Sequence, residues 1–338
     1  MNFITKGSGP LYYNFVFLFA GYDYHAAMLG KELLTHPLVR IYKYAFKGNR
    51  LEEFLFHLHT AYSINEKFEI PFKSIWFKRM YEQDFSNDLP ICFVYVSPNM
   101  VRYEGGFIDY VRKQNPDNRI VMLHWDLISK KVKYEYDIIK RKVDLAITYD
   151  SEEAKKYGIH YFRETVYSKL VKEPESPEIK WDVYFLGAAK DRLDKLYEIY
   201  AFLKGNNLKC KFLIADVPAE KRISGEEIEY IDSITYKKNL HYVIESKCIL
   251  EVVQGNSSDI TTRAKEAMAY GKRLITDCRS DLRSCFHEGQ LICFSEVSQI
   301  DPDLIRADYP TGGYPPLLDM NPLKRLYDIQ EQLEKLNG

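Results

Sequence analysis

Residues 246–277 read SKCILEVVQGNSSDITTRAKEAMAYGKRLITD, which is the pattern of a strand, a turn, a helix and a second strand. The apolar run at 249–253 predicts a buried strand, and the Gly-Asn-Ser-Ser sequence after it is rich in turn-forming residues. Residues 259–270 are predicted to form a helix that Ser258 caps and Gly271 ends. Strand–helix–strand units of this kind build parallel α/β sheets.

The predicted helix has two unlike sides. Small and apolar residues with helical spacing occupy the side that would pack on the sheet: Ile260, Ala264, Ala267, Met268 and Gly271. The other side carries Thr262, Arg263 and Glu266, and Thr261 lies at the start of the helix. Free backbone N–H groups, two hydroxyls and an arginine at a helix N-terminus attract a diphosphate, and a carboxylate one turn further can accept two ribose hydroxyls. An ordinary surface with an exposed Arg263–Glu266 ion pair fits the spacing equally well.

Short apolar runs alternate with helix-length amphipathic runs along the whole chain, which predicts βαβ units around parallel sheets. In the first half, strands are predicted at residues 14–20, 91–96, 119–123 and 144–148, and helices at 24–34, 51–62, 107–113 and 136–142. In the second half, strands are predicted at 182–186, 210–214, 227–231, 249–253 and 273–276, and helices at 191–203, 238–246, 259–270 and 322–336.

A charged segment with two prolines, KEPESPEIK at residues 172–180, separates the two halves and is interpreted as a linker. We therefore expect one Rossmann-like domain over residues 1–171, a second over 181–312, and a tail with a final helix over 313–338. Ligands of such domains bind beyond the carboxyl ends of the strands, so a two-domain version is expected to hold its ligands in a cleft.

Composition and charge narrow the class of protein. The 338 residues are 46% hydrophobic and 28% charged, as in a folded soluble protein, and the net charge of −1 provides no overall field for nucleic acid. We accordingly expect no nucleic-acid partner. The YYNFVFLFA run at residues 12–20 is short for a signal peptide and fits a first buried strand. With no apolar run of about 20 residues, the sequence favours a cytoplasmic protein.

The six cysteines form no C-x-x-C pair and no zinc spacing. Cys92, Cys210, Cys248 and Cys293 lie in or beside apolar runs, which predicts buried free thiols in a reducing compartment.

A second candidate phosphate element follows the first strand of the second half, in the sequence GAAKDR at residues 187–192. Gly187 would allow a ligand to approach the backbone, and Lys190 and Arg192 could neutralise phosphate charge. The alternative is a tight strand–helix turn with two solvated basic residues. No G-x-G-x-x-G motif occurs, which argues against a nicotinamide or flavin dehydrogenase.

In the first half, acid–base candidates follow predicted strands. His124 and Asp126 come after the run at 119–123, and Asp23 and His25 come after the first strand. Any of them could take a proton from an acceptor hydroxyl. A helix-capping role for Asp23 and hydrogen-bonded structural roles for the histidines are equally good interpretations, and Glu104 is a third possibility for the base.

Metal sites are not predicted. The rings of His57 and His59, two residues apart on a helix, would point away from each other. The only D-x-D, formed by Asp301 and Asp303, has a proline between its carboxylates and lies in a late irregular segment. We expect neither a metal nor an organic cofactor.

The sequence EAMAYGKRLIT, from Glu266 to Thr276, resembles the donor domain of GT-B glycosyltransferases. More narrowly, the chain is similar to bacterial glycosyltransferases of lipopolysaccharide and capsular polysaccharide synthesis. The stretches that carry this likeness are VDLAITYD at 143–150, EAKKYG at 153–158, YFLG at 184–187 with Lys190 and Arg192, SKCILEVVQ at 246–254, and residues 262–277.

The resemblance implies a GT-B-like α/β fold with two Rossmann-like domains facing a cleft, and a C-terminal helix that crosses back to the first domain. It implies a glycosyltransferase that takes a nucleoside-diphosphate sugar, expected to be a UDP-sugar, in the second domain. A glycan or lipid-linked glycan acceptor would bind to the first domain.

The resemblance assigns the role of Glu266, and the residue chemistry described above suggests the other roles. Glu266 would hold the ribose, and the diphosphate would lie near Thr261 and Thr262 with Lys190, Arg192 and Arg263. Many GT-B donor domains have a second acidic residue eight positions before the ribose glutamate, where this chain has Ser258. Gln254 or Asp259 is then expected to substitute near the donor sugar, and Glu251 and Ser258 are also expected among the donor-binding residues. Asp126 is the expected base, with His124 tuning it and Asp23 or His25 as substitutes; a retaining mechanism would need no protein base.

Two other classes of protein remain open, a sugar-nucleotide epimerase that works without NAD and a non-catalytic nucleotide- or glycan-binding module. One further segment, FKSIWFKRMY at residues 72–81, interleaves aromatic and cationic side chains. It fits a core helix with solvated lysines, or an interfacial helix that would bring the enzyme to the inner membrane face.

Overall fold

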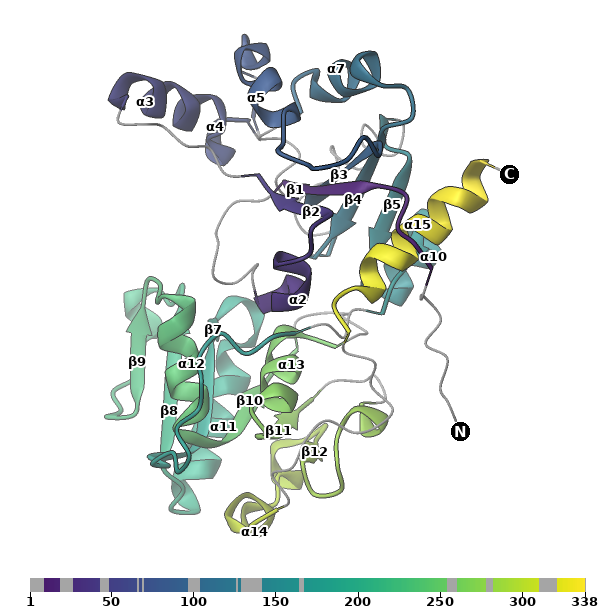
Figure 1. Cartoon of the computed structure of the whole chain (residues 1–338). Coiled ribbons are helices and arrows are strands. Elements are labelled where there is room, and N and C mark those ends of the chain that lie inside the picture. Colours follow the sequence, from purple (N-terminus) through teal and green to yellow (C-terminus); the bar gives the residue numbers. More distant parts are fainter. Residues whose placement is uncertain are drawn as a thin grey trace, which may run out of the picture. The chain divides into compact units, whose positions relative to one another are not determined.

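The computed structural model describes residues 9–18, 27–42, 49–65, 67–68, 70–96, 104–125, 127–128, 142–163, 167–253, 260–277, 282–309 and 321–337. These residues divide into two compact units (Figure 1). The first unit comprises the described residues of Met1–His25, Leu29–Arg163 and Asn321–Gly338, and the second those of Ala26–Met28 and Glu164–Met320. Each unit is built on one parallel six-stranded sheet.

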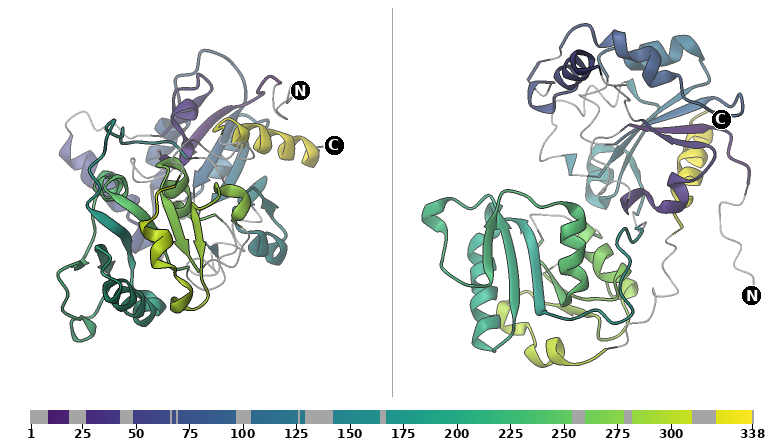
Figure 2. Two further views of the ribbon diagram at one scale, coloured as in Figure 1. Left: turned by 90° about the horizontal axis from the view of Figure 1, so that it is seen from below. Right: turned by 60° about the vertical axis from the view of Figure 1, so that its left-hand side comes forward.

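The sheet of the first unit has helices on both faces (Figure 2). Its strands lie in the order β2 (Val39–Ile41), β1 (Asn14–Leu18), β3 (Ile91–Val96), β4 (Arg119–His124), β5 (Leu145–Thr148) and β6 (His160–Tyr161). Side chains alternate across a strand, so Phe15 and Phe17 enter one core and Val16 and Leu18 enter the other.

Different helices complete these two cores. The Phe15 side packs against α2 (Lys31–Leu34) and α15 (Lys324–Asn337). The Val16 side packs against α3 (Arg50–His59), η1 (Lys73–Trp76), α5 (Phe77–Tyr81) and α7 (Phe107–Gln114). The short helices α4 (Tyr62–Asn65) and α10 (Ser151–Tyr157) also belong to this unit.

Helix α15 follows the second unit in the sequence but packs in the first. Its residues Leu326, Ile329 and Leu333 have helical spacing and are at most 1% exposed. The side chain of Gln330 accepts a hydrogen bond from the backbone N–H of Tyr12 at 2.7 Å. The predicted return of the C-terminal helix to the first domain is confirmed.

The sheet of the second unit has the strand order of a dinucleotide-binding Rossmann domain. Along the sheet lie β12 (Leu291–Cys293), β11 (Arg273–Thr276), β10 (Ser246–Glu251), β7 (Trp181–Ala188), β8 (Cys210–Ala215) and β9 (Ile228–Ile231). Numbered along the chain within this unit, and taken from the β9 edge, the order is 3-2-1-4-5-6. The α/β fold class with two Rossmann-like domains is confirmed.

Helices cover both faces of this sheet as well. On one face, α11 (Leu193–Gly205) packs Leu196, Ile199 and Leu203 into the core. On the other, α12 (Tyr236–Ile244) and α13 (Thr262–Ala269) contact β7, β10 and β11. The remaining short helices are η2 (Lys190–Arg192), η3 (Ala219–Lys221), η4 (Arg283–Cys285), η5 (Val297–Gln299) and α14 (Pro302–Arg306).

Some predicted boundaries are wrong for local reasons. Strand β10 begins three residues before the predicted 249–253, because Ser246 already pairs with Trp181 in the sheet, and α12 therefore ends at Ile244. The predicted helix 24–34 is interrupted at Gly30, which adopts φ 86: residues 27–29 are helical, and α2 begins after the glycine. The predicted helix 136–142 lies outside the described residues, apart from its last residue.

Short edge strands are absent from the predictions, because β2, β6 and β12 have only two or three residues and leave no periodic pattern. The last of these strands also corrects the prediction that Cys293 is buried. Ile292 turns inward, so the next residue, Cys293, is exposed. Cys92, Cys210 and Cys248 are buried free thiols as predicted.

Candidate nucleotide-binding site

The strand order of the second unit locates its ligand-binding edge. Strands β7 and β10 are neighbours, yet the helices that follow them, α11 and α13, lie on opposite faces. At such a switch point the connections diverge and leave room for a ligand beyond the carboxyl ends of the strands. Gly187 lies near the end of β7, and Glu251 is the last residue of β10.

Two arginines converge on Gly187. A Cβ atom at this glycine would lie 2.5 Å from Arg263 Nη2 and 2.9 Å from Arg192 Nη2. Arg263 donates from Nε and Nη2 to the Leu186 carbonyl at 3.0 and 2.5 Å, and Arg192 donates from Nη2 to the Ala188 carbonyl at 3.0 Å. The absence of a side chain at Gly187 thus allows two guanidinium groups to meet at one backbone position.

This arrangement concentrates positive charge in a partly buried place. Burial, and to a smaller extent the neighbouring charge of Arg263, lowers the pKa of Arg192 to about 10. Arg192 is only 9% exposed, so water screens the two cations poorly. An anion bound between them would relieve this repulsion, and a guanidinium matches phosphate oxygens in geometry as well as charge.

Helix α13 begins beside these arginines. Thr261, and not the predicted Ser258, caps it, because its hydroxyl accepts a hydrogen bond from the backbone N–H of Ala264 at 3.3 Å. The helix is therefore three residues shorter at its start than predicted. Thr262 is the first helical residue, so the positive end of the helix dipole lies at this point.

Glu251 bonds to the residue that caps this helix. It is fully buried, and its carboxylate accepts hydrogen bonds from the hydroxyls of Thr261 and Thr276. Burial raises the pKa of Glu251, while the two threonine hydrogen bonds oppose that rise. In this arrangement both carboxylate oxygens are engaged within the protein, so Glu251 holds the cap of α13 in place.

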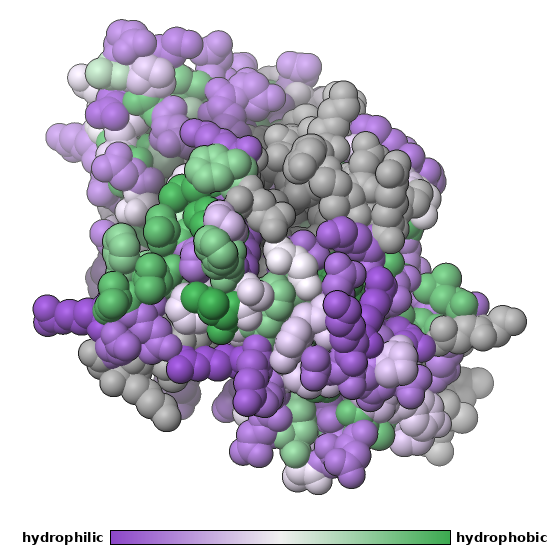
Figure 3. All heavy atoms as spheres, turned by 90° about the horizontal axis from the view of Figure 1, so that it is seen from above, coloured by the Kyte–Doolittle hydropathy of each residue, from purple (hydrophilic) through white to green (hydrophobic). Residues whose placement is uncertain are grey.

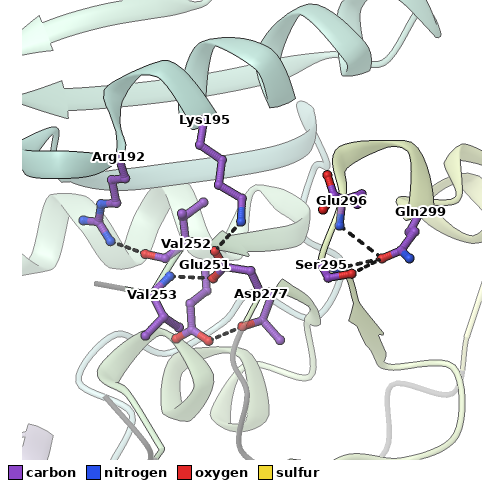
Figure 4. Close-up of polar contacts among 10 residues, drawn as sticks. Arg192, Lys195, Glu251, Val252, Val253, Asp277, Ser295, Glu296 and Gln299 are labelled. Carbon is purple, nitrogen blue, oxygen red and sulfur yellow. Dashed lines mark hydrogen bonds and ion pairs between the residues drawn. The ribbon is translucent and has the colours of Figure 1, made fainter. Parts of the chain in front are cut away.

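The backbone that leaves β10 is fixed on two sides (Figure 4). Arg192 donates to the Val252 carbonyl, and Asp277 accepts from the Val253 N–H at 2.6 Å. Lys195 donates to the other oxygen of Asp277 at 2.9 Å. Asp277 was not among the predicted site residues, although it ends the stretch that indicated the site.

Glu266 lies one turn into α13 and is 4% exposed. Its Oε1 accepts hydrogen bonds from Tyr236 Oη at 2.8 Å and from Asn239 Nδ2 at 2.9 Å. Burial raises the pKa of Glu266 to about 7, against the effect of the Tyr236 hydrogen bond and of the Arg263 charge. An exposed Arg263–Glu266 ion pair is therefore ruled out, since Glu266 is buried and Arg263 bonds to a carbonyl.

The predicted residues are brought together only in part. Gly187, Arg192 and Arg263 are in contact, while Lys190 is exposed with φ 46. Gln254, Ser258 and Asp259 lie outside the described residues. The sequence analysis did not identify Tyr236 and Asn239 of α12 as partners of Glu266. Their three-residue spacing is visible in the sequence, but the contact between α12 and α13 is not.

The catalytic candidates of the first unit are mostly outside the described residues, which exclude Asp23, His25 and Asp126. His124 ends β4, opposite Thr148 of β5, and is 1% exposed. Burial lowers the pKa of His124 to about 4, so its imidazole is neutral at physiological pH. Any role of His124 in proton transfer stays a prediction.

The D-x-D sequence has a structural role. Asp301 caps α14 by accepting from the N–H groups of Asp303 and Leu304, and Asp303 pairs with Arg306 at 2.9 Å. Over the described ranges, no three histidine, cysteine, aspartate or glutamate side chains are grouped to hold a metal ion. In the same ranges, no helix combines the length and apolar character needed to span a bilayer.

Comparisons with known proteins give a structural likeness only. No protein-family model and no curated protein matches the sequence. Among solved structures, the chain is similar to an α-glucosyltransferase in complex with UDP and DNA, with a TM-score of 0.49, 11% identity, and coverage of 95% of this chain and 94% of that chain. It is also similar to the glycosyltransferase SnogD from Streptomyces nogalater, with a TM-score of 0.37, 11% identity, and coverage of 96% and 95%.

A third similar structure is a DNA-modifying β-glucosyltransferase, with a TM-score of 0.42, 14% identity, and coverage of 77% of this chain and 79% of that chain. None of the three is described as acting on lipopolysaccharide or capsule. Two of them are associated with DNA, and the expectation of no nucleic-acid partner for this chain stays a prediction. At these identities and TM-scores the likeness concerns the fold, and the candidate site is defined by its own geometry.

Proposed function

We propose that the protein is a glycosyltransferase whose second unit binds a nucleoside-diphosphate sugar. The observation that carries this proposal is the pair of guanidinium groups of Arg192 and Arg263 over Gly187, beside the start of α13 and one turn from the buried carboxylate of Glu266. Cations, the positive end of a helix dipole and a carboxylate in this order match a diphosphate followed by a ribose.

In the proposed reaction, the bond between the anomeric carbon and the diphosphate breaks and the acceptor oxygen takes the sugar. The anomeric carbon gains oxocarbenium character, as in glycoside hydrolysis, while negative charge accumulates on the departing diphosphate. Arg192, Arg263 and the N-terminus of α13 are fixed before the reaction, so they stabilise that charge without reorganisation. Asp126 of the first unit is proposed as the base that deprotonates the acceptor.

Melting the protein with a panel of UDP-, GDP-, TDP-, ADP- and CMP-sugars tests the donor site. We expect stabilisation by nucleoside diphosphates, with the uridine series strongest, because bound ligand raises the melting temperature. Arg263→Ala should abolish the stabilisation, while Arg306→Ala, which removes an exposed arginine paired with Asp303, should not. Equal stabilisation of both variants would contradict the proposed diphosphate site.

An activity assay then separates transferase from rival classes. A transferase releases nucleoside diphosphate and lengthens an acceptor, an epimerase returns an isomerised donor, and a binding module does neither. The finer proposal is that the acceptor is a glycan or lipid-linked glycan of a bacterial surface polysaccharide. The acceptor panel should include glycans, lipid-linked glycans and duplex DNA, and transfer to DNA alone would replace that proposal. Asp126→Asn should reduce turnover about 10²–10⁴-fold without changing donor affinity.

An exposed apolar surface supports a further part of the proposal, that the first unit contacts a membrane to reach a lipid-linked acceptor. Six large apolar side chains between residues 51 and 75 are 37–76% exposed: Leu51, Phe54, Leu58, Phe68, Phe72 and Ile75. Figure 3 views the molecule from the side of α3 and α5 and shows hydrophobic side chains gathered beside hydrophilic ones. Single exposed apolar residues are ordinary on protein surfaces, but a group of this size is typical of an interaction site.

The charges around this apolar group are balanced, because Arg79 pairs with Glu52 and Lys78 with Glu82. Membrane contact would then depend on insertion of the apolar side chains, so flotation should be similar with zwitterionic and anionic vesicles. Phe72→Ser should abolish flotation in both, while Leu304→Ser, a 44% exposed control in α14, should not. Absence of flotation by the parent protein would contradict membrane contact.

A further inference from the structure

The carboxylate of Glu266 is held from one side by helix α12. Tyr236 is the first residue of α12 and Asn239 follows one turn later, so both face α13. Their hydrogen bonds, at 2.8 and 2.9 Å, both end on Oε1 of Glu266. Within the described residues, Oε2 receives no hydrogen bond.

The direction of each hydrogen bond follows from counting protons. Tyr236 has one hydroxyl hydrogen, which it gives to Glu266, so in its 2.9 Å contact with Tyr167 the donor is Tyr167. Tyr184 donates to Asn239 Oδ1 at 2.9 Å, which orients the amide so that its NH₂ group faces Glu266. Tyr167 and Tyr236 thus form one chain of hydrogen-bond donors, and Tyr184 and Asn239 form a second. Both chains end on Oε1 of Glu266.

This polarised arrangement divides the carboxylate into two unlike oxygens. Oε1 accepts two protein hydrogen bonds, and Oε2 keeps its acceptor capacity for a ligand. An oxygen with unused acceptor capacity can accept hydrogen bonds from neighbouring hydroxyls such as those of ribose. Because α12 is packed against the sheet, the ligand-facing oxygen is fixed before any nucleotide binds.

We propose that Tyr236 is a positioning residue of the nucleotide site: with Asn239 it fixes Glu266 so that Oε2 accepts the ribose hydroxyls, and Tyr167 supports it in turn. This inference rests on the proposed nucleotide-binding function of the second unit. Tyr167 lies close to the point, between Arg163 and Glu164, at which the chain passes from the first unit to the second.

The arrangement has a consequence for pH dependence. Since Oε1 already accepts two hydrogen bonds, a proton taken up by Glu266 must reside on Oε2, which then becomes a donor. Two titratable or charged groups that face Glu266 are Tyr236 on α12 and Arg263 on its own helix. Two more are Tyr184 on β7 and Tyr270 at the end of α13, and the charge of Glu266 helps to raise the pKa of both tyrosines. Nucleotide affinity should therefore fall as the pH drops through about 7, the pKa of Glu266.

Calorimetric titration with uridine 5′-diphosphate and with its 2′,3′-dideoxy analogue, between about pH 5.5 and 9, tests the inference. Tyr236→Phe removes a hydrogen bond that lowers the pKa of Glu266. We expect it to weaken binding of the diphosphate about tenfold at pH 7 and to shift the affinity profile to higher pH. The loss should shrink at pH 9 and be absent for the dideoxy analogue.

Two further variants complete the experiment. Tyr167→Phe should shift the profile in the same direction by a smaller amount, and it provides the test if Tyr236→Phe does not fold. Tyr197→Phe is the matched control, because it removes a hydroxyl from another bonded tyrosine pair of this unit, Tyr197 with Tyr230 at 2.8 Å. It should leave the affinity unchanged.

The outcomes separate this inference from the function on which it rests. Equal loss of affinity at every pH and for both nucleotides would mean that Tyr236 is merely structural, and would overturn the inference. A parent protein that binds both nucleotides equally well would overturn it too, since the ribose hydroxyls would then make no contact. A parent protein that binds no nucleoside diphosphate would overturn the proposed function itself.

Discussion

At the scale of single residues, Gly187 is the position where the smallest change should have the largest effect on ligand binding. In Gly187→Ala the new methyl group would displace the ends of Arg192 and Arg263, which are flexible, so the fold should survive. We expect the affinity for UDP to fall about tenfold or more, since charged hydrogen bonds to phosphate would be lost. Gly205→Ala is the control, because a Cβ at Gly205 meets nothing within 4 Å. Titration calorimetry measures the affinity of both variants for UDP, and equal affinities would contradict the role of the arginine pair.

The buried carboxylate of Glu266 should lower the free energy of unfolding when it is charged, although the proposed nucleotide site needs it in that form. Its pKa is about 7 in the folded protein against the ordinary value of 4.5, so the native state holds this proton more tightly than the unfolded chain. The group therefore favours the fold below about pH 4.5, and that contribution is lost as the pH rises through about 7. Glu266→Gln should raise the free energy of unfolding by on the order of 3 kcal/mol at pH 8 and little at pH 4.5. Urea denaturation at both pH values measures this, and a pH-independent difference would contradict it.

At the scale of secondary structure, the two threonine caps of the second unit allow a matched comparison. Thr235 caps α12 by accepting from the Lys238 N–H and is exposed, whereas Thr261 caps α13 and also donates to the buried Glu251. Thr235→Ala should cost about 1 kcal/mol, the usual value of a cap. Thr261→Ala should cost about 1–3 kcal/mol more, because a buried carboxylate loses a donor. Equal losses in urea denaturation would show that the Thr261–Glu251 contact contributes nothing.

The same elements show what the sequence can predict. Strands β3 and β11 have the predicted ends, since β3 is an apolar run between Pro90 and Ser97, and β11 is a four-residue strand with apolar residues at its centre. The Glu266 carboxylate could be predicted from its spacing on one helix, but its partners could not. Asn239 and Tyr236 are 27 and 30 residues away, and only the packing of α12 against α13 brings them into contact. Local patterns predict elements, whereas contacts between elements depend on how the sheet orders them.

At the scale of the whole molecule, the chain crosses between units more often than a linker at 172–180 implies. Residues 27–28 belong to the second unit and residues 321–337 to the first. The last helix could be assigned to the first domain only through the family resemblance, because its amphipathic pattern does not say which sheet it covers. The paired arginines likewise come from helices on opposite faces of one sheet, an arrangement that no stretch of sequence displays.

This division predicts that the two units melt separately and respond to different changes. UDP should raise only the transition of the second unit, because a ligand stabilises the structure that binds it. Ile329 of α15 is fully buried in the first unit, so Ile329→Ala should cost about 2–5 kcal/mol and lower only the transition that UDP leaves unchanged. Leu336→Ala in the same helix, at a 63% exposed position, should change neither transition. Scanning calorimetry with and without UDP distinguishes these cases. A shift of the UDP-sensitive transition by Ile329→Ala would mean that α15 stabilises the second unit, against the packing of Leu326, Ile329 and Leu333 in the core of the first.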